Sequence, residues 1–352
     1  MTAPTSSNSG PVAPRLGGEL PAGADGAPTA PWALPADVLA FSHGRAALSW
    51  LHAARGPFRS ALHAAYTCPS VPEHLDRLGI ARDAFDLGCT ESAVIEAARA
   101  LPGPVLVLVP ALFGAAPWLD AAAIARALGA HGAVLVDAAQ TAFGALDIPC
   151  PPNGFVLSCP RKALAISDGA LLRTDQMRDG ERDSVARLPE AREAAALKFQ
   201  ARALFASGRE ADEDEALRAN KAAEATLPAA PHRMSDSARA ALARIDADRH
   251  RARRRANAAT LADALRGRIA CALPPGGVPF HFPLLIANRD EVLRRMQRRR
   301  LFATALWPDA RLDPARQPRA ARHARELLAL PIDQRYDTAD IAAIADLARA
   351  CL

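Results

Sequence analysis

One lysine of this chain has polar neighbours that are suited to chemistry. Lys162 lies four residues after Ser158, just beyond a predicted strand, in the segment SCPRKALAISDGALL. Asp137 ends the preceding predicted strand, and Gln140 follows in DAAQTAFGA. If these strands are neighbours in a parallel sheet, a lysine, a carboxylate, a hydroxyl and an amide converge on one edge of that sheet.

Pyridoxal phosphate needs such a set of groups. It takes a lysine amine as a Schiff base, its ring nitrogen needs a carboxylate that keeps it protonated, and its phosphate needs hydroxyl and N–H donors. A helix that we expect to begin near Gly44 would offer unpaired N–H groups and the positive end of its dipole to that phosphate. Each feature alone has a simpler explanation, because a lysine after a strand is usually solvated and an aspartate at a strand end often caps a helix.

Motifs of other catalytic classes are missing from the sequence. It contains no GxGxxG after a predicted strand, no GxxxxGK[ST], no HExxH and no GxSxG, which removes the usual signatures of nucleotide-binding loops and hydrolases. The cysteines lie far apart with no CxxC spacing, so we expect free thiols and no metal site. They are Cys68, Cys89, Cys150, Cys159, Cys271 and Cys351.

Hydrophobic patterning predicts the elements that carry these residues. Apolar runs over 104–110 and 133–137 predict two strands on either side of a helix, with Asp120 as its N-cap and Gly129 or Gly132 near its end. Such a strand-helix-strand unit implies a parallel sheet that is covered on both faces. Further apolar runs over 155–160 and 169–174 continue the sheet, which places Asp137 and Ser158 at the carboxyl ends of their strands.

Composition divides the chain into three parts. Residues 1–30 are rich in Pro, Ala, Gly and Ser, and we expect a disordered tail outside the fold. Residues 31–233 are expected to form a large domain, which ends in polar connecting helices of little functional information over about 175–230. Residues 234–352 are expected to form a smaller C-terminal α/β domain.

Length and charge narrow the class of protein. The 352 residues are 50% hydrophobic, enough to bury a full core, and no apolar run approaches the roughly 18 residues of a membrane helix. The net charge of +5 comes mainly from arginine, which bunches over 249–255 and 294–300. Both bunches lie in helix-favouring stretches, so we interpret them as solvated helix faces rather than a nucleic-acid surface. Without a signal-peptide pattern, we expect a cytoplasmic protein with neither membrane nor nucleic-acid partners.

From about Phe41 to the C-terminus, the sequence resembles the DegT/DnrJ/StrS family of pyridoxal-phosphate-dependent sugar aminotransferases. FSHGRAAL is similar to the family's SGxxAL opening, AYTCPSV to its PxYT segment, and the stretch from VLVPALF to DAAQTAFGA to its strand-helix-strand core. SCPRKALAISDGALL resembles a lysine segment that reads SxRK followed by DGG, RMSDSARAALARID resembles an RMSDxQAA helix, and LALPIDQRY resembles an LPIHQRY ending. The order of DAAQ and then the RK segment is the most specific of these matches.

The resemblance implies a fold and a set of residue roles. The fold is the α/β architecture of fold-type-I aminotransferases, in which a large, mostly parallel sheet carries helices on both faces and a smaller α/β lobe follows. Lys162 would be the Schiff-base lysine and proton shuttle, Asp137 the partner of the pyridine nitrogen, and Gln140 a contact to the ring hydroxyl. Cys68 stands where the family often has an aromatic residue against the ring. The phosphate cradle would comprise Gly44, Arg45, Ala46 and Ser158.

The resemblance also implies a reaction and a partner. An amino acid, commonly glutamate, would supply nitrogen to a keto sugar attached to a nucleotide, in a homodimer whose subunits share the active site. The family's partner-subunit asparagine is replaced here by Pro231 and His232, so His232 or Arg233 is the candidate crossing element. The alternative is a degenerate family member that keeps the fold for binding or regulation, which the loss of the aromatic residue at Cys68 would favour. A third alternative, a nucleic-acid binder, would show strongly salt-dependent DNA binding.

Overall fold

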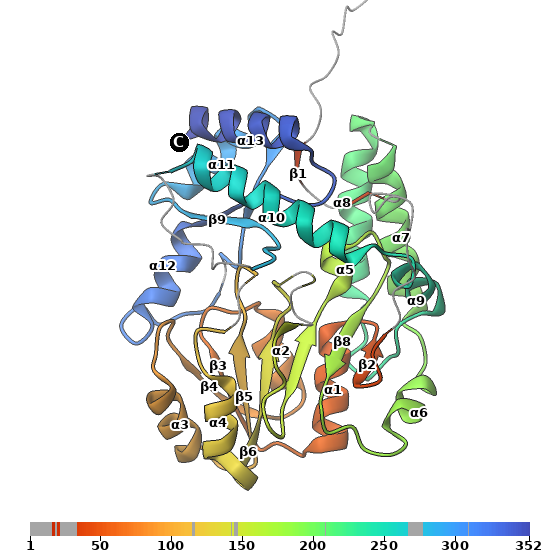
Figure 1. Cartoon of the computed structure of the whole chain (residues 1–352), viewed down its shortest axis with the longest axis vertical. Coiled ribbons are helices and arrows are strands. Elements are labelled where there is room, and N and C mark those ends of the chain that lie inside the picture. The colour runs from red at the N-terminus through yellow and green to blue at the C-terminus, as the bar shows by residue number, and fades with distance from the viewer. Residues whose placement is uncertain are drawn as a thin grey trace, which may run out of the picture.

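A seven-stranded sheet forms the centre of the larger lobe in the computed structural model (Figure 1). The model describes residues 16–17, 20–21, 34–114, 117–141, 143, 147–207, 209–266, 277–308 and 310–352. Within these residues the strand order is β2-β8-β7-β6-β5-β3-β4. The strands from β3 to β7 run parallel, and β8 runs antiparallel to both β7 and β2. Their bounds are β2 Val38–Phe41, β3 Ser60–Ala64, β4 Ala81–Phe85, β5 Val105–Pro110, β6 Gly132–Asp137, β7 Phe155–Ser158 and β8 Ala170–Arg173.

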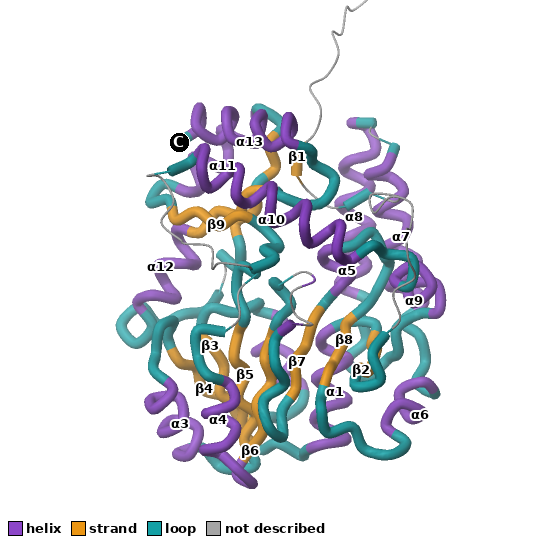
Figure 2. Tube along the Cα trace, in the orientation of Figure 1, coloured by secondary structure: helices purple, strands orange, loops and turns teal. Residues whose placement is uncertain are grey.

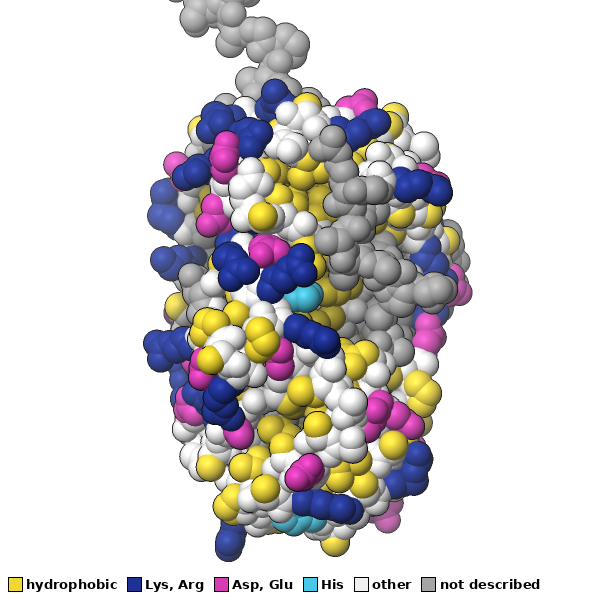
Figure 3. Space-filling view, turned by 90° about the vertical axis from the view of Figure 1, so that its left-hand side faces the viewer, with side chains coloured by type: hydrophobic (Ala, Val, Ile, Leu, Met, Phe, Trp, Pro, Cys, Tyr) yellow, Lys and Arg dark blue, Asp and Glu magenta, His cyan; other side chains and the backbone are white. Residues whose placement is uncertain are grey.

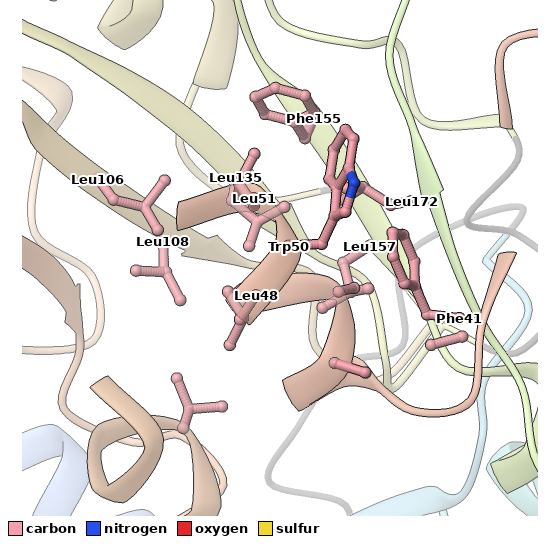
Figure 4. Close-up of a cluster of buried hydrophobic side chains, with 14 of the residues drawn as sticks. Phe41, Leu48, Trp50, Leu51, Leu106, Leu108, Leu135, Phe155, Leu157 and Leu172 are labelled. Carbon is pink, nitrogen blue, oxygen red and sulfur yellow. The ribbon is translucent and has the colours of Figure 1, made fainter. Parts of the chain in front are cut away.

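Helices cover both faces of this sheet, as the apolar runs predict. Strand β5 shows why, because successive side chains of a strand point to opposite faces and all six of its residues are buried. Leu106 and Leu108 pack in one cluster with Trp50 (Figure 4), whereas Val107 packs in another with Ile124. The helices of this part are α1 Gly44–Arg55, α2 Ser70–Arg77, α3 Glu91–Ala100 and α4 Ala121–Leu128, with a 3-10 turn Gly129–His131.

The predicted strand-helix-strand unit is confirmed at β5, α4 and β6. Asp120 is the N-cap of α4, since its side chain accepts a hydrogen bond from the Ala123 N–H at 2.9 Å. Gly129 follows the helix with a φ of 53°, a conformation that favours glycine. Strands β5 and β6 pair in parallel through to their carboxyl ends. The loops at those ends therefore lie on one edge of the sheet.

The connector and the C-terminal lobe follow the sheet along the chain. In Figures 1 and 2, α7 and α8 form a hairpin beside α5. Helices α10, α11 and α13 lie beyond one end of the sheet's strands, and α3 and α4 lie beside the other end. The described residues contain no helix with the length and apolar character needed to cross a membrane. The division at residues 233 and 234 stays a prediction. The short helix α5 Pro160–Ala163 lies between β7 and β8. The connector comprises α6 Glu181–Ala186, α7 Arg192–Ala206 and α8 Glu210–Ala225, and α9 Asp236–Leu242 follows it. The C-terminal elements are α10 Ala247–Ala264, β9 Phe282–Leu285, α11 Arg289–Arg298, β10 Leu301–Phe302, β11 Thr304–Ala305, α12 Pro318–Glu326, β12 Leu327–Leu330 and α13 Thr338–Cys351.

The arginines of the first bunch, over 249–255, differ in their surroundings. On the face drawn in Figure 3, Lys and Arg side chains lie among acidic and apolar ones. Arg251 of α10 is ion-paired with Asp147. Arg254 of the same helix is fully buried, so the interpretation of this bunch as a solvated face is wrong for Arg254.

Part of the N-terminal segment belongs to the fold, which corrects the expected tail over residues 1–30. Leu16–Gly17 form β1, which pairs in parallel with β10, and the Gly17 N–H donates to the Tyr336 hydroxyl at 2.7 Å. Leu16 and Leu20 are buried, and the Leu20 carbonyl accepts from Arg202 at 3.0 Å. Two buried leucines and a strand pair dock this segment although its composition is that of a tail. The rest of residues 1–30 lies outside the described residues.

The loops after β2 and before β8 are tied to the start of α9. The Gly169 N–H donates to the Ser42 carbonyl at 2.7 Å. Asp168 is buried and accepts hydrogen bonds from the N–H and the hydroxyl of Ser235, the N-cap of α9, at 3.2 and 3.1 Å. Burial raises the pKa of Asp168 to about 6, although both of these hydrogen bonds oppose the rise.

Truncation tests the docking of the N-terminal segment. We expect a variant that begins at Ala22 to unfold with a free energy about 3 kcal/mol lower than one that begins at Pro14, because it lacks the buried Leu16 and Leu20. Chemical denaturation of both variants measures this difference. Equal unfolding midpoints would show that the segment contributes nothing to stability.

The Asp168→Asn variant tests the buried carboxyl. Since the folded protein binds this proton more tightly than the unfolded chain, the stability that Asp168 contributes is present below about pH 4 and is lost as the pH rises through about 6. Denaturation across that range should show a wild-type decline on the order of 2 kcal/mol that Asp168→Asn lacks. Asp236→Asn, on the exposed side of the same helix start, should keep the decline. Parallel curves of unfolding free energy against pH for Asp168→Asn and the wild type would contradict this role of Asp168.

Candidate active site

A cavity of about 520 Å³ lies between the carboxyl ends of the parallel strands, the α7–α8 hairpin and the C-terminal lobe. Most of the residues predicted from the sequence line it. These are Gly44, Arg45, Cys68, Asp137, Gln140 and Lys162. The other two, Ala46 and Ser158, are buried next to the wall and do not line the cavity.

Asp137 stands at the carboxyl end of β6 and faces the cavity. One carboxylate oxygen accepts a hydrogen bond from the Ala139 N–H at 3.0 Å. Among the described residues, no cationic side chain forms an ion pair with this carboxylate. Burial raises the pKa of Asp137, and the nearby charge of Lys162 opposes the rise only in part. The site therefore holds a half-buried acceptor that a cationic group on a ligand would stabilise.

Lys162 lies on the short helix α5, four residues after Ser158, the last residue of β7. The C-terminal lobe holds this helix in place, because the carbonyl of the next residue, Ala163, accepts from Gln334 at 2.9 Å and from the buried Arg254 at 3.3 Å. The backbone that carries the lysine is thus fixed by two side chains far along the chain.

The N-terminus of α1 points its free N–H groups toward the same cavity. Gly44 is the first residue of this 12-residue helix, and the first N–H groups of a helix have no partner within it. The macrodipole adds partial positive charge at this end, and the guanidinium of Arg45 lies beside it. This end of the cavity suits an anion.

His43, the N-cap of α1, was not identified from the sequence. It lines the cavity and is 1% exposed, and its side chain makes no capping hydrogen bond to the helix. Its Nδ1 contacts the Ser42 hydroxyl at 2.8 Å, while its Nε2 is buried and has no hydrogen-bond partner within the part of the chain that the structure describes. Burial, together with the charges of Arg161 and Arg45, lowers the pKa of His43 to about 3. The only signal in the sequence is a bulky ring where Ser, Thr, Asp or Asn usually caps a helix.

The connector contributes one wall of the cavity, which corrects the expectation that it carries little functional information. From α8, Glu224 accepts from Arg161 at 2.6 Å and lies 3.9 Å from Arg45. Burial alone would raise the pKa of Glu224, but the charges of Arg161, Lys198 and Arg45 lower it to about 2. Lys198 of α7 lines the cavity too and donates to Asn220.

The C-terminal lobe supplies aromatic side chains to the opposite wall. Trp307 lines the cavity, and its ring centroid lies 5.0 Å from that of Tyr66. The Tyr66 hydroxyl donates to the Leu306 carbonyl at 2.9 Å, which fixes the two segments against each other. Cys68, two residues after Tyr66, faces the cavity with its sulfur 3.1 Å from the Ser70 hydroxyl.

The candidate crossing element lies away from these walls. Arg233 pairs with Glu190 at 2.9 Å and with Asp236 at 2.6 Å, both in its own chain. His232 contacts the Ala230 carbonyl at 2.9 Å. Neither residue lines the cavity, so a role of this segment across a dimer stays a prediction.

Comparison with known proteins shows the fold. No protein-family model and no curated protein matches this chain. DesV of S. venezuelae, solved in complex with a ketimine intermediate, matches with a TM-score of 0.60 at 18% identity, over 89% of this chain and 84% of that one. DesI, solved in the presence of its TDP-sugar product, matches with a TM-score of 0.59 at 19% identity, over 89% of this chain and 80% of that one. Spr1654 from Streptococcus pneumoniae, a putative sugar aminotransferase in its PMP form, matches with a TM-score of 0.61 at 11% identity, over 97% of this chain and 94% of that one. The predicted fold class is confirmed: the chain has the aminotransferase fold that these structures share.

Proposed function

We propose that this chain is a pyridoxal-phosphate-dependent aminotransferase of the DegT/DnrJ/StrS type, which moves an amino group from an amino acid to a keto sugar. The observation that carries the proposal is one cavity that brings together Lys162, the half-buried carboxylate of Asp137 and the N-terminus of α1. Lys162 suits the aldehyde of pyridoxal phosphate, Asp137 suits its ring nitrogen, and the helix terminus suits its phosphate. Aminotransferases of the same fold support the reaction class.

The residues present fit this cofactor on grounds of their own chemistry. The half-buried Asp137 carboxylate has one N–H donor among the described residues, so a protonated pyridine nitrogen would supply a further hydrogen bond and a countercharge. The free N–H groups at the start of α1 suit phosphate oxygens. When bound, pyridoxal phosphate supplies the electron sink for the transfer of the amino group.

Each residue has a distinct task in the proposed reaction. Lys162 moves a proton at its Nζ, and it must be neutral to act as a nucleophile. Asp137 holds the proton on the ring nitrogen, and Gln140, whose amide is buried in the wall, orients the ring hydroxyl. Arg254 and Gln334 keep the helix of Lys162 in register by holding the Ala163 carbonyl.

Two of the proposed cradle residues contribute less than the resemblance implies. Ser158 and Ala46 are buried beside the cavity and do not line it. We therefore propose that Gly44 and Arg45 contact the phosphate from the helix terminus, with Ala46 contributing through its backbone N–H alone. Cys68 faces the cavity and is proposed to lie against the ring without aromatic stacking.

For the substrates, we propose glutamate as the amino donor and a nucleotide-linked keto sugar as the acceptor. The structure of DesI in the presence of its TDP-sugar product supports the acceptor class by likeness of fold. A cavity lined by Trp307 on one side and by Arg45 and Arg161 on another offers an aromatic surface and cationic groups to such a ligand.

We extend the proposal to a homodimer. Phe199 of α7 and Leu217 of α8 are 64% and 49% exposed, unusual for large apolar side chains. Leu217 also lines the cavity, so a second copy of the chain that covers this hairpin would close the site.

Covalent labelling tests the assignment of the lysine. When pyridoxal phosphate is added to the wild type and reduced with borohydride, we expect the added mass on the peptide that contains Lys162. Lys198→Ala is the matched control, because Lys198 lines the same cavity, and it should label as the wild type does. Lys162→Ala should not label. Added mass on Lys198 or Lys221 would refute the assignment.

Asp137→Asn tests the electron-sink role. We expect this variant to bind pyridoxal phosphate with little loss but to transfer the amino group from glutamate on the order of 100-fold more slowly, because a neutral amide no longer holds the ring proton. A single-turnover spectrum of the loaded protein measures the rate. Equal rates in variant and wild type would remove Asp137 from the mechanism. A wild type that binds the cofactor and transfers no amino group would favour the degenerate, ligand-binding alternative.

A further inference from the structure

His43 has an unsatisfied polar atom that the proposed reaction does not use. The ring is 1% exposed and belongs to the lining of the cavity, and its Nε2 is buried with no hydrogen-bond partner among the described residues. Buried polar atoms are nearly always hydrogen-bonded in folded proteins, so an exception on a ring that lines a cavity points to a ligand that completes it. The other ring nitrogen is already in contact with Ser42, so Nε2 is the atom that such a ligand would reach.

His43 is not explained as a helix cap. A capping side chain accepts from the second or third N–H of its helix, and His43 makes no such bond to α1. The ring therefore leaves the first N–H groups of this 12-residue helix open and adds its own Nε2 at the same end. His43 and Gly44, the first residue of the helix, both belong to the lining of the cavity.

The surroundings of His43 select a neutral ring. Burial, together with the charges of Arg161 and Arg45, disfavours an imidazolium, as the lowered pKa of His43 reflects. Glu224 accepts from Arg161 at 2.6 Å and lies 3.9 Å from Arg45, so these two cations share one countercharge. A neutral imidazole carries one hydrogen, on either nitrogen. If Nε2 carries it, Nδ1 accepts from the Ser42 hydroxyl at 2.8 Å, that hydroxyl gives up its 3.3 Å hydrogen bond to the His232 carbonyl, and Nε2 becomes a donor. Phosphate oxygens only accept, so a phosphate at the start of α1 would favour this tautomer.

We propose that His43 binds the phosphate of the cofactor by donating from Nε2, beside the first N–H groups of α1. The inference deepens the proposed function and rests on it. Its consequence is selectivity: the bond adds to the affinity for pyridoxal phosphate and adds nothing for pyridoxal, which has no phosphate. A histidine that only shaped the wall would affect both ligands alike.

Two substitutions separate the ring nitrogens. In His43→Asn the amide reaches the place of Nδ1 and keeps a partner for Ser42 but has no donor at the place of Nε2. In His43→Gln the longer side chain restores a donor there. Equilibrium dialysis of the full chain against pyridoxal phosphate and against pyridoxal gives both dissociation constants for the wild type and each variant. Thermal unfolding of the unloaded proteins shows whether each variant folds, and the ³¹P NMR signal of the bound phosphate reports its environment directly.

We expect His43→Asn to weaken the binding of pyridoxal phosphate about tenfold or more, to leave pyridoxal unchanged, and to shift the ³¹P signal. His43→Gln should recover most of the loss. The inference is overturned if His43→Asn weakens the binding of both ligands by the same factor, or if it changes the binding of neither ligand. In that case the proposed function stands as long as the wild type prefers pyridoxal phosphate. A wild type that binds neither ligand would overturn both.

Discussion

The arrangement depends on one half-buried carboxylate that has no countercharge in contact among the described residues. Asp137 ends a strand between two parallel neighbours, where its side chain meets the cavity. Burial raises its pKa, the Ala139 N–H is its donor, and Lys162 acts on it from a distance greater than that of an ion pair. A buried charge is retained in a protein when something compensates it, and a protonated pyridine nitrogen would do so. We interpret Lys162, Gln140 and the start of α1 as parts of one cofactor site because this carboxylate lies among them.

Distant parts of the chain close the site around it. The C-terminal lobe fixes the helix of Lys162 through Arg254 and Gln334, while the α7–α8 hairpin brings Glu224 to Arg161. Leu20, near the start of the chain, also lines the cavity. The site is therefore coupled to the packing of three segments that no short motif contains. Changes in the hairpin or the last lobe should affect the site without touching Asp137.

The sequence predicts those parts of the fold and site that local rules decide. The strand ends at Asp137 and Ser158 follow from apolar runs of fixed length, and the start of α1 at Gly44 follows from helical periodicity. The docking of Leu16 was not predictable from its neighbours, because a proline- and glycine-rich composition says nothing of a strand partner some 285 residues away. The burial of Arg254 and the cavity contact of Lys198 likewise depend on tertiary packing rather than on helix propensity.

The protonation state of the bound ring nitrogen tests the central claim most directly. We would load the wild type and Asp137→Asn with pyridoxal phosphate that carries ¹⁵N in the ring, and record the ¹⁵N chemical shift of the bound cofactor near neutral pH. The account predicts a protonated ring nitrogen in the wild type and an unprotonated one in Asp137→Asn. An unprotonated nitrogen in the wild type, or the same shift in both proteins, would contradict it.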